Sequence, residues 1–112
     1  MKIAITAKGR DWDSAVDPRF GRTEYFFIYD EKNNSSRVVD NTDVVHEAHG
    51  AGPRTAQRLF EAGTDVLITG NGPGGNAAAV LQKAGVRVYA GAANMSVREA
   101  YEAYKAGKLK EF

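Results

Sequence analysis

The chain contains no cysteine. This absence excludes disulfide bonds, a thiol nucleophile and any zinc or iron-sulfur site that this chain alone would ligate through cysteine. Histidine is also scarce, with two residues in 112. A metal held by the protein would therefore need carboxylates, ligands of its own, or a second subunit.

Long hydrophobic runs are missing as well. No apolar run approaches the roughly 20 residues of a membrane span, and charged residues rather than a cleavage-type segment follow the first apolar stretch. With 15 basic and 14 acidic residues, the formal net charge is +1, so no global field favours nucleic acid or an anionic membrane. We therefore expect a cytoplasmic protein without a nucleic-acid or membrane partner. The length predicts a single domain over residues 1–112.

The first third of the chain has the pattern of β-strands. Residues 2–7 alternate, with Ile3 and Ile5 on one face and Ala4 and Thr6 on the other. Residues 24–31 are aromatic or β-branched on both faces, and a turn cluster at residues 32–36 leads to a partner strand at residues 37–40. The pattern predicts a strand followed by a hairpin.

The remainder alternates helices with strands. Pro53 suits the first position of a helix that ends at Gly63, and a second helix runs from Gly75 to Gly85. Ser96 with Glu99 predicts a capping box at the start of a third helix, which ends near Gly107. Strands are expected at residues 65–69 and 86–90, and residues 108–112 are expected to form a short tail.

These elements predict an α/β fold with three layers, α/β/α. Right-handed crossovers place helices on both faces of a five-stranded mixed sheet of order 3-2-1-4-5, in which only strand 2 is antiparallel. The loops at residues 8–22, 41–52, 70–75 and 91–95 would then converge at one sheet edge. Open α/β sheets bind ligands at this carboxyl edge, where the winding direction changes.

The loop Gly70-Asn-Gly-Pro-Gly-Gly75 leads directly into the second helix. Its backbone amides and the positive helix end would suit a phosphate, a molybdate or a negatively charged cluster. It has no Gly-Lys-Ser/Thr of a P-loop and no dinucleotide fingerprint. The alternative is a tight turn that needs glycine conformations. The candidate cofactor-binding residues at this edge, besides arginines, are Asn71, Gly72, Gly74, Gly75, Asn76 and Asn94.

His46 and His49 are three residues apart, and in a helical turn both would face one metal. Two nitrogens do not complete a site, so further ligands would come from carboxylates, solvent, sulfides of a cofactor or a second subunit. The alternative is a pair of surface histidines in a polar loop.

Four segments together carry a family resemblance: Asp17-Pro-Arg-Phe-Gly-Arg22, His46-Glu-Ala-His49-Gly-Ala-Gly, Asp65-Val-Leu-Ile-Thr-Gly70 and Gly85-Val-Arg-Val-Tyr89. In their order and spacing the chain resembles the dinitrogenase iron-molybdenum cofactor biosynthesis family, the nitrogenase accessory factor-like proteins. The resemblance implies a ribonuclease-H-like motif. It also implies a function in carrying, storing or inserting molybdenum-containing or iron-sulfur clusters, with a cofactor-receiving enzyme as a further partner.

One position departs from the family. Many relatives have a histidine immediately before Phe-Gly, where this chain has Arg19. A guanidinium does not ligate a metal in ordinary conditions, but it holds sulfide, molybdate or phosphate oxygens by charge-assisted hydrogen bonds. We therefore expect Arg19 and Arg22, with Arg10, to clamp an anion. The alternative is a solvated loop whose arginines make surface ion pairs.

Catalysis is not expected. Ser14 and Ser96 have no histidine and acid in a recognisable arrangement, and the strand-end aspartates do not gather at the carboxyl edge. The sequence thus predicts a small, non-enzymatic protein that carries, stores or helps assemble a molybdenum or iron-sulfur type cofactor, or its anionic precursor, as an oxyanion or thioanion. The alternatives are a phosphate- or nucleotide-binding regulatory module and a protein-protein adaptor.

Overall fold

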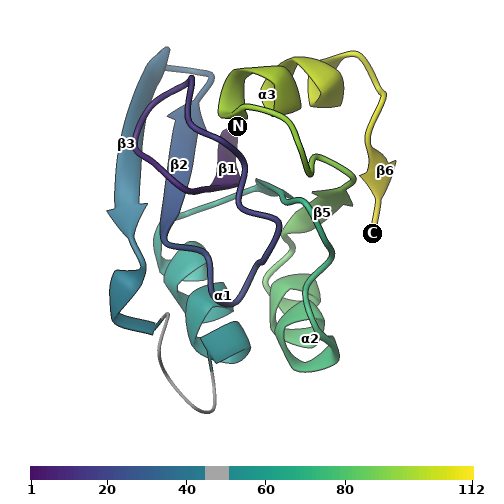
Figure 1. The fold of residues 1–112 in the computed structure, drawn as a ribbon. Helices are drawn as coiled ribbons and strands as arrows, with labels where there is room; N and C mark the ends of the chain where they lie inside the picture. Colours follow the sequence, from purple (N-terminus) through teal and green to yellow (C-terminus); the bar gives the residue numbers. More distant parts are fainter. Residues whose placement is uncertain (45–50) are drawn as a thin grey trace.

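A mixed sheet runs through the described part of the protein and contains six strands (Figure 1). The structure is a computed structural model that describes residues 1–44 and 51–112, without the side chains of Ala51 and Asn76. The sheet order is β3-β2-β1-β4-β5-β6. The strands are β1 (Lys2–Ala7), β2 (Tyr25–Asp30), β3 (Ser35–Asp40), β4 (Val66–Ile68), β5 (Arg87–Ala90) and β6 (Lys110–Glu111).

The predicted α/β class and the order 3-2-1-4-5 are confirmed, but the sheet has six strands rather than five. The predicted tail at residues 108–112 contains β6, which pairs antiparallel with β5 through Tyr89 opposite Glu111 and Ala90 opposite Lys110. Strand β2 is therefore not the only antiparallel strand. Strand β6 was not predicted, because a strand of two charged residues has no hydrophobic alternation.

Helices cover both faces of this sheet, as the three-layer prediction requires (Figure 1). Helices α1 (Ala51–Glu61) and α2 (Gly75–Lys83) pack together on one face, and α3 (Val97–Lys105) lies on the other. A short 3-10 turn, η1 (Thr42–Val44), follows β3. Helix α1 begins two residues before Pro53, which therefore lies in its first turn, where a missing N–H costs little.

Alternation along the central strands divides the core into two layers. Ala4 of β1 packs with Leu59 of α1 and Leu81 of α2. Ile3 and Ile5 pack on the other face with Val97 and Ala100 of α3. Each of these seven residues is at most 1% exposed. Burying side chains on both faces fixes the register, because a shift of one residue would exchange the two faces.

The helix ends also follow their predicted signals. Gly63 and Gly85 both have φ of +77°, a conformation that ends a helix and that glycine adopts without strain. Ser96 and Glu99 form the predicted capping box at α3: the Ser96 hydroxyl accepts from the Glu99 N–H at 3.1 Å, and the Glu99 carboxylate accepts from the Ser96 N–H at 2.9 Å.

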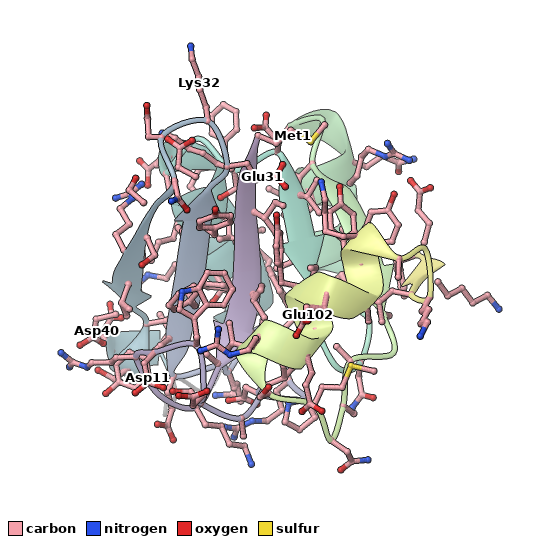
Figure 2. The ribbon with its side chains drawn as sticks, turned by 90° about the horizontal axis from the view of Figure 1, so that it is seen from above. Met1, Asp11, Glu31, Lys32, Asp40 and Glu102 are labelled. Atoms are coloured by element: carbon pink, nitrogen blue, oxygen red, sulfur yellow. The ribbon has the colours of Figure 1, made fainter. Side chains whose placement is uncertain are left out.

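The two ends of the strands are far apart and carry different loops. The carboxyl edge is the side of the sheet at which β1, β3, β4 and β5 end. Figure 2 shows Asp11 and Asp40 at the carboxyl edge of β1, and Met1, Glu31 and Lys32 at the opposite edge. Among the described residues, no helix combines the length and the apolar composition needed to cross a bilayer.

Candidate functional site

The loop after β1, residues 8–24, begins on the α3 face of the sheet. Its carbonyl groups at Trp12 and Ser14 accept hydrogen bonds from the N–H groups of Arg98 and Val97, at 2.9 and 2.8 Å. Since Ser96 caps the next N–H of this first turn, acceptors from the chain itself occupy the amino end of α3. That helix end therefore offers little to an external anion.

The same loop then passes to the loop after β4, residues 69–74. Asp17 is held against β1, because its N–H donates to the Thr6 carbonyl at 3.0 Å and its carbonyl accepts from the Thr6 hydroxyl at 2.7 Å. The next residue, Pro18, accepts a hydrogen bond of 2.8 Å from the Asn71 N–H. The two loops thus share a rigid contact at the carboxyl edge.

Helix α1 and the turn after β3 join this contact from the other side. The Thr55 hydroxyl donates to the Gly21 carbonyl at 2.9 Å, and the buried Asn41 amide donates to the Thr23 carbonyl at 2.9 Å. Phe20 is buried and packs against Phe26, with ring centroids 5.9 Å apart. The loops that follow β1, β3 and β4 therefore meet around the residues from Asp17 to Thr23.

The amino end of α2 lies at this junction and differs from that of α3. Its N-cap residue is Gly74, in an extended conformation, and among the side chains that the structure describes none caps the helix. A Cβ atom built on Gly74 or Gly75 would meet no atom within 4 Å, so the space beside them is open. Unsatisfied N–H groups at such a helix end, together with the helix dipole, attract anions.

The amino ends of α1 and α2 are also close to each other. A Cβ atom on Gly52 would lie 3.3 Å from the Cβ of Ala77. Two helices consequently direct their positive ends toward neighbouring parts of the same edge. The predicted contributions of Asn71, Gly72, Gly74 and Gly75 come from this region, whereas the Asn76 side chain is not described.

Arg19 lies one residue after the Pro18 contact and is fixed by Asp17. Its Nε and Nη2 atoms donate to Oδ1 and Oδ2 of Asp17, both at 3.1 Å, and its backbone N–H donates to Oδ1 at 3.0 Å. The Asp17 side chain is completely buried, while 48% of the Arg19 side chain is exposed. The hydrogen bond with Asp17 raises the pKa of Arg19, so the guanidinium stays charged.

The other two arginines are placed differently. Arg10 stacks over the Tyr25 ring, 4.9 Å from its centroid, and pairs with Asp40 at 3.9 Å. The hydrogen bond with Tyr25 is the main cause of the raised pKa of Arg10. Tyr25 packs with the α3 layer, so Arg10 belongs to that side of the loop. Arg22 is half-buried near Thr23, within the junction of the loops.

Asn94 is separated from the α2 end. It has φ of +68° and lines a pocket of about 360 Å³ on the α3 side, together with Lys8, Asp13 and Ser96. Pro18 also lines this pocket, and it is the point where the two sides of the carboxyl edge come together. The structure thus brings Pro18, the residue before Arg19, into contact with the Gly70–Gly75 loop and leaves Arg10 and Asn94 on the α3 side.

Metal ligation depends on residues outside this description. His46 and His49 lie in the segment that the structure does not describe, so their role as metal ligands stays a prediction. Within residues 1–44 and 51–112, no group of three or more His, Cys, Asp or Glu side chains could hold a metal ion. The described donors are N–H groups and guanidinium groups, and such donors fit an anion rather than a bare cation.

The sequence prediction did not include Phe112. Its N–H donates to the Val88 carbonyl at 2.7 Å, which extends the β6 pairing, and its ring lies against Gly72, where a Cβ atom would collide with it. The ring is 64% exposed. The available signal in the sequence was an aromatic residue directly after Lys110 and Glu111. This signal does not identify Gly72 as the neighbour of the ring.

Solved structures of other proteins resemble the whole fold, among them the following two. The apo form of the orange protein from Desulfovibrio gigas matches with a TM-score of 0.93 and 37% identity, over 99% of this chain and 92% of that chain. An NMR structure of a Thermotoga protein, described as a candidate NifB protein, matches with a TM-score of 0.85 and 42% identity, over 98% of this chain and 91% of that chain. None of the curated proteins compared with the chain matches it.

A family model described as "Dinitrogenase iron-molybdenum cofactor" matches residues 1–107. The family and the similarity to the orange protein point to a small, non-enzymatic protein that binds or carries a cofactor. The match extends over nearly the whole length and includes every segment on which the resemblance was based. The chain therefore belongs to the dinitrogenase iron-molybdenum cofactor family.

Proposed function

We propose that the protein binds an anionic, molybdenum-containing metal-sulfur cofactor, or its oxyanion or thioanion precursor, and carries or stores it for a receiving enzyme. The cargo lies at the carboxyl edge, between the loop after β1 and the amino end of α2. Arg19, Arg22 and the backbone N–H groups of Gly72 and of residues 74–76 bind it without a covalent bond. Membership of the dinitrogenase iron-molybdenum cofactor family supports this choice of cargo.

One observation carries the proposal: within residues 1–44 and 51–112, no described side chain caps the amino end of α2, and the space beside Gly74 and Gly75 is open. Helix α3 provides the internal comparison, since Ser96, Glu99 and the loop carbonyls fill its amino end. An external anion would complete α2 in the way that these acceptors complete α3.

The absence of cysteine is consistent with such a cargo. A metal-sulfur cluster with a complete set of its own sulfides needs hydrogen-bond donors and positive charge more than it needs thiolate ligands. His46 and His49 precede α1 by a few residues, and we propose them as further ligands to the cargo's metal. This part of the proposal is separable, because the anion contacts do not depend on it.

A pair of aspartate substitutions tests the site. Gly74→Asp places a carboxylate at the α2 N-cap, where it accepts hydrogen bonds from the N–H groups of the first turn and repels an anion, while the helix itself gains a good cap. We expect anaerobic titration with tetrathiomolybdate to give an affinity at least about tenfold lower than that of the wild-type protein, equivalent to roughly 1.4 kcal/mol.

The matched control is Ser96→Asp. It adds the same charge at the N-cap of α3, where Ser96 already accepts from the Glu99 N–H. It should leave the affinity within about twofold of wild type, because the new charge lies at the α3 helix end rather than at the α2 end and is screened by salt. Equal losses in both variants would show that net charge, rather than the α2 end, governs binding. Unchanged binding in Gly74→Asp would remove α2 from the site.

The same open helix end also favours one alternative, a module that binds phosphate or a nucleotide. Backbone N–H donors at a helix terminus accept phosphate as readily as a thioanion. Thermal stabilisation by inorganic phosphate or ATP, without stabilisation by tetrathiomolybdate, would select this alternative.

A further inference from the structure

The Asp17–Arg19 pair has a feature that a surface ion pair lacks. Asp17 is completely buried, and it contacts Arg19 through both carboxylate oxygens and through the Arg19 backbone N–H. A bidentate pair of this kind fixes the plane of the guanidinium as well as its position. The orientation of Arg19 is therefore set by the interior of the protein, although half of its side chain faces solvent.

Asp17 is itself held in place by two strands. Its backbone is bonded to Thr6 of β1 on both sides, by the 3.0 Å and 2.7 Å hydrogen bonds, and the Thr6 hydroxyl lies 3.1 Å from that of Thr69, just after β4. The adjacent Pro18 is bonded to Asn71. The central strands thus determine where the Arg19 guanidinium lies relative to the loop that precedes α2.

The guanidinium keeps donors for a second partner. Of its five N–H groups, one on Nε and one on Nη2 are directed to Asp17, which leaves three for an anion. Seen from a distance, the Asp17 carboxylate cancels most of the positive charge of Arg19. Recognition by Arg19 then depends on the direction of its hydrogen bonds more than on its charge.

We propose that Asp17 is a positioning residue for anion binding, and that it holds the Arg19 fork in the orientation that the cargo requires. This inference rests on the proposed function. It has a consequence opposite to that of simple electrostatics, because Asp17 is a negative charge beside an anion site. If charge alone governed binding, removing this negative charge would strengthen the binding of an anion. If the orientation of Arg19 governs binding, removing Asp17 weakens it.

Asp17→Asn therefore tests the inference through the sign of its effect. We expect tetrathiomolybdate to bind about tenfold more weakly to this variant, the loss typical of one charge-assisted hydrogen bond. The control is Asp13→Asn, which removes the same charge from the same loop at a side chain that is 85% exposed. It should change the affinity by no more than about twofold, as expected for a screened surface charge. Equal or tighter binding in Asp17→Asn would overturn the inference.

Arg19→Lys supplies a second test that does not require Asp17 to be altered. Lysine keeps a cation beside the buried carboxylate but has no planar fork. We expect its affinity to be reduced about as far as that of Asp17→Asn, and wild-type affinity in Arg19→Lys would contradict the inference. Cooperative thermal unfolding of each variant confirms that a folded protein was titrated.

The result with Gly74→Asp separates this inference from the function on which it depends. Binding that is sensitive to Gly74→Asp but not to Asp17→Asn or Arg19→Lys would retain the site and reject the positioning role. Failure of the wild-type protein to bind would reject both.

Discussion

Gly70 lies so close to Pro18 that a Cβ atom on Gly70 would stand 2.6 Å from the Pro18 Cα. Both partners at this contact are backbone, so neither can rotate away. Gly70→Ala should therefore force the two loops apart and destabilise the protein by about 1–3 kcal/mol, the usual cost of overpacking. Urea unfolding would measure this loss, and tetrathiomolybdate affinity should fall with it.

Gly75→Ala is the control for that substitution. The added methyl group meets no atom within 4 Å, and residue 75 is the first residue of α2. Alanine there should be neutral or stabilise the protein by about 0.4–1 kcal/mol, through a smaller entropy of the unfolded chain. If the two glycine substitutions had the same effect on stability, the contact with Pro18 would not be the cause.

Asp43 should make the stability depend on pH in the acidic range. Arg58 donates to both of its carboxylate oxygens, at 2.7 and 2.9 Å, and this lowers the pKa of Asp43 to about 2 from the ordinary 3.8. A carboxyl group whose pKa is depressed by folding stabilises the fold above its unfolded pKa, and this contribution is lost as the pH falls through the folded pKa.

The comparison of wild type with Asp43→Asn isolates that contribution. Wild type should have the larger free energy of unfolding at pH 5, and the difference should shrink between about pH 4 and pH 2 as the carboxylate takes up its proton. Denaturant unfolding at a series of pH values measures it. A difference that stayed constant down to pH 2 would contradict the assignment of the low pKa to Asp43.

Gly72 and Phe112 should be energetically coupled. A methyl group at Gly72 collides with the Phe112 ring, but the ring is 64% exposed and can rotate into solvent. Gly72→Ala should therefore cost no more than about 1 kcal/mol, and most of that cost should disappear in a Phe112→Ala background. A double-mutant cycle of unfolding free energies checks this, and strictly additive effects would show that the ring and the loop are independent.

Much of the fold was predictable because its signals are local. The alternation over residues 2–7 predicted β1 with its observed bounds, and Ser96 with Glu99 predicted the capping box that begins α3. Both patterns depend on residues a few positions apart. Strand β6 depends instead on the Arg87–Glu111 ion pair and on pairing with β5, contacts that span about twenty residues and leave no periodicity in the sequence.

The candidate site was predictable only in part, for a related reason. Strand directions brought the loops to one edge, but the sequence does not say on which side of that edge a residue lies. Residues 12–15 lie beside the amino end of α3. The loop reaches the α2 side only at Asp17 and Pro18. Arg10 and Arg19, nine residues apart in one loop, were therefore grouped by the sequence and are separated by the fold. Arg19 has its fixed orientation because Asp17 is buried, which no sequence pattern indicates.

Bound metal decides whether this chain carries a molybdenum-containing anionic cargo, as we claim. The protein, purified under anaerobic conditions without a histidine tag, would be analysed for molybdenum, iron, copper and zinc before and after incubation with tetrathiomolybdate. We predict near-stoichiometric molybdenum after incubation, with a sharp decrease in Gly74→Asp and in His46→Ala with His49→Ala. Protein that stays free of metal under every condition would contradict the claim.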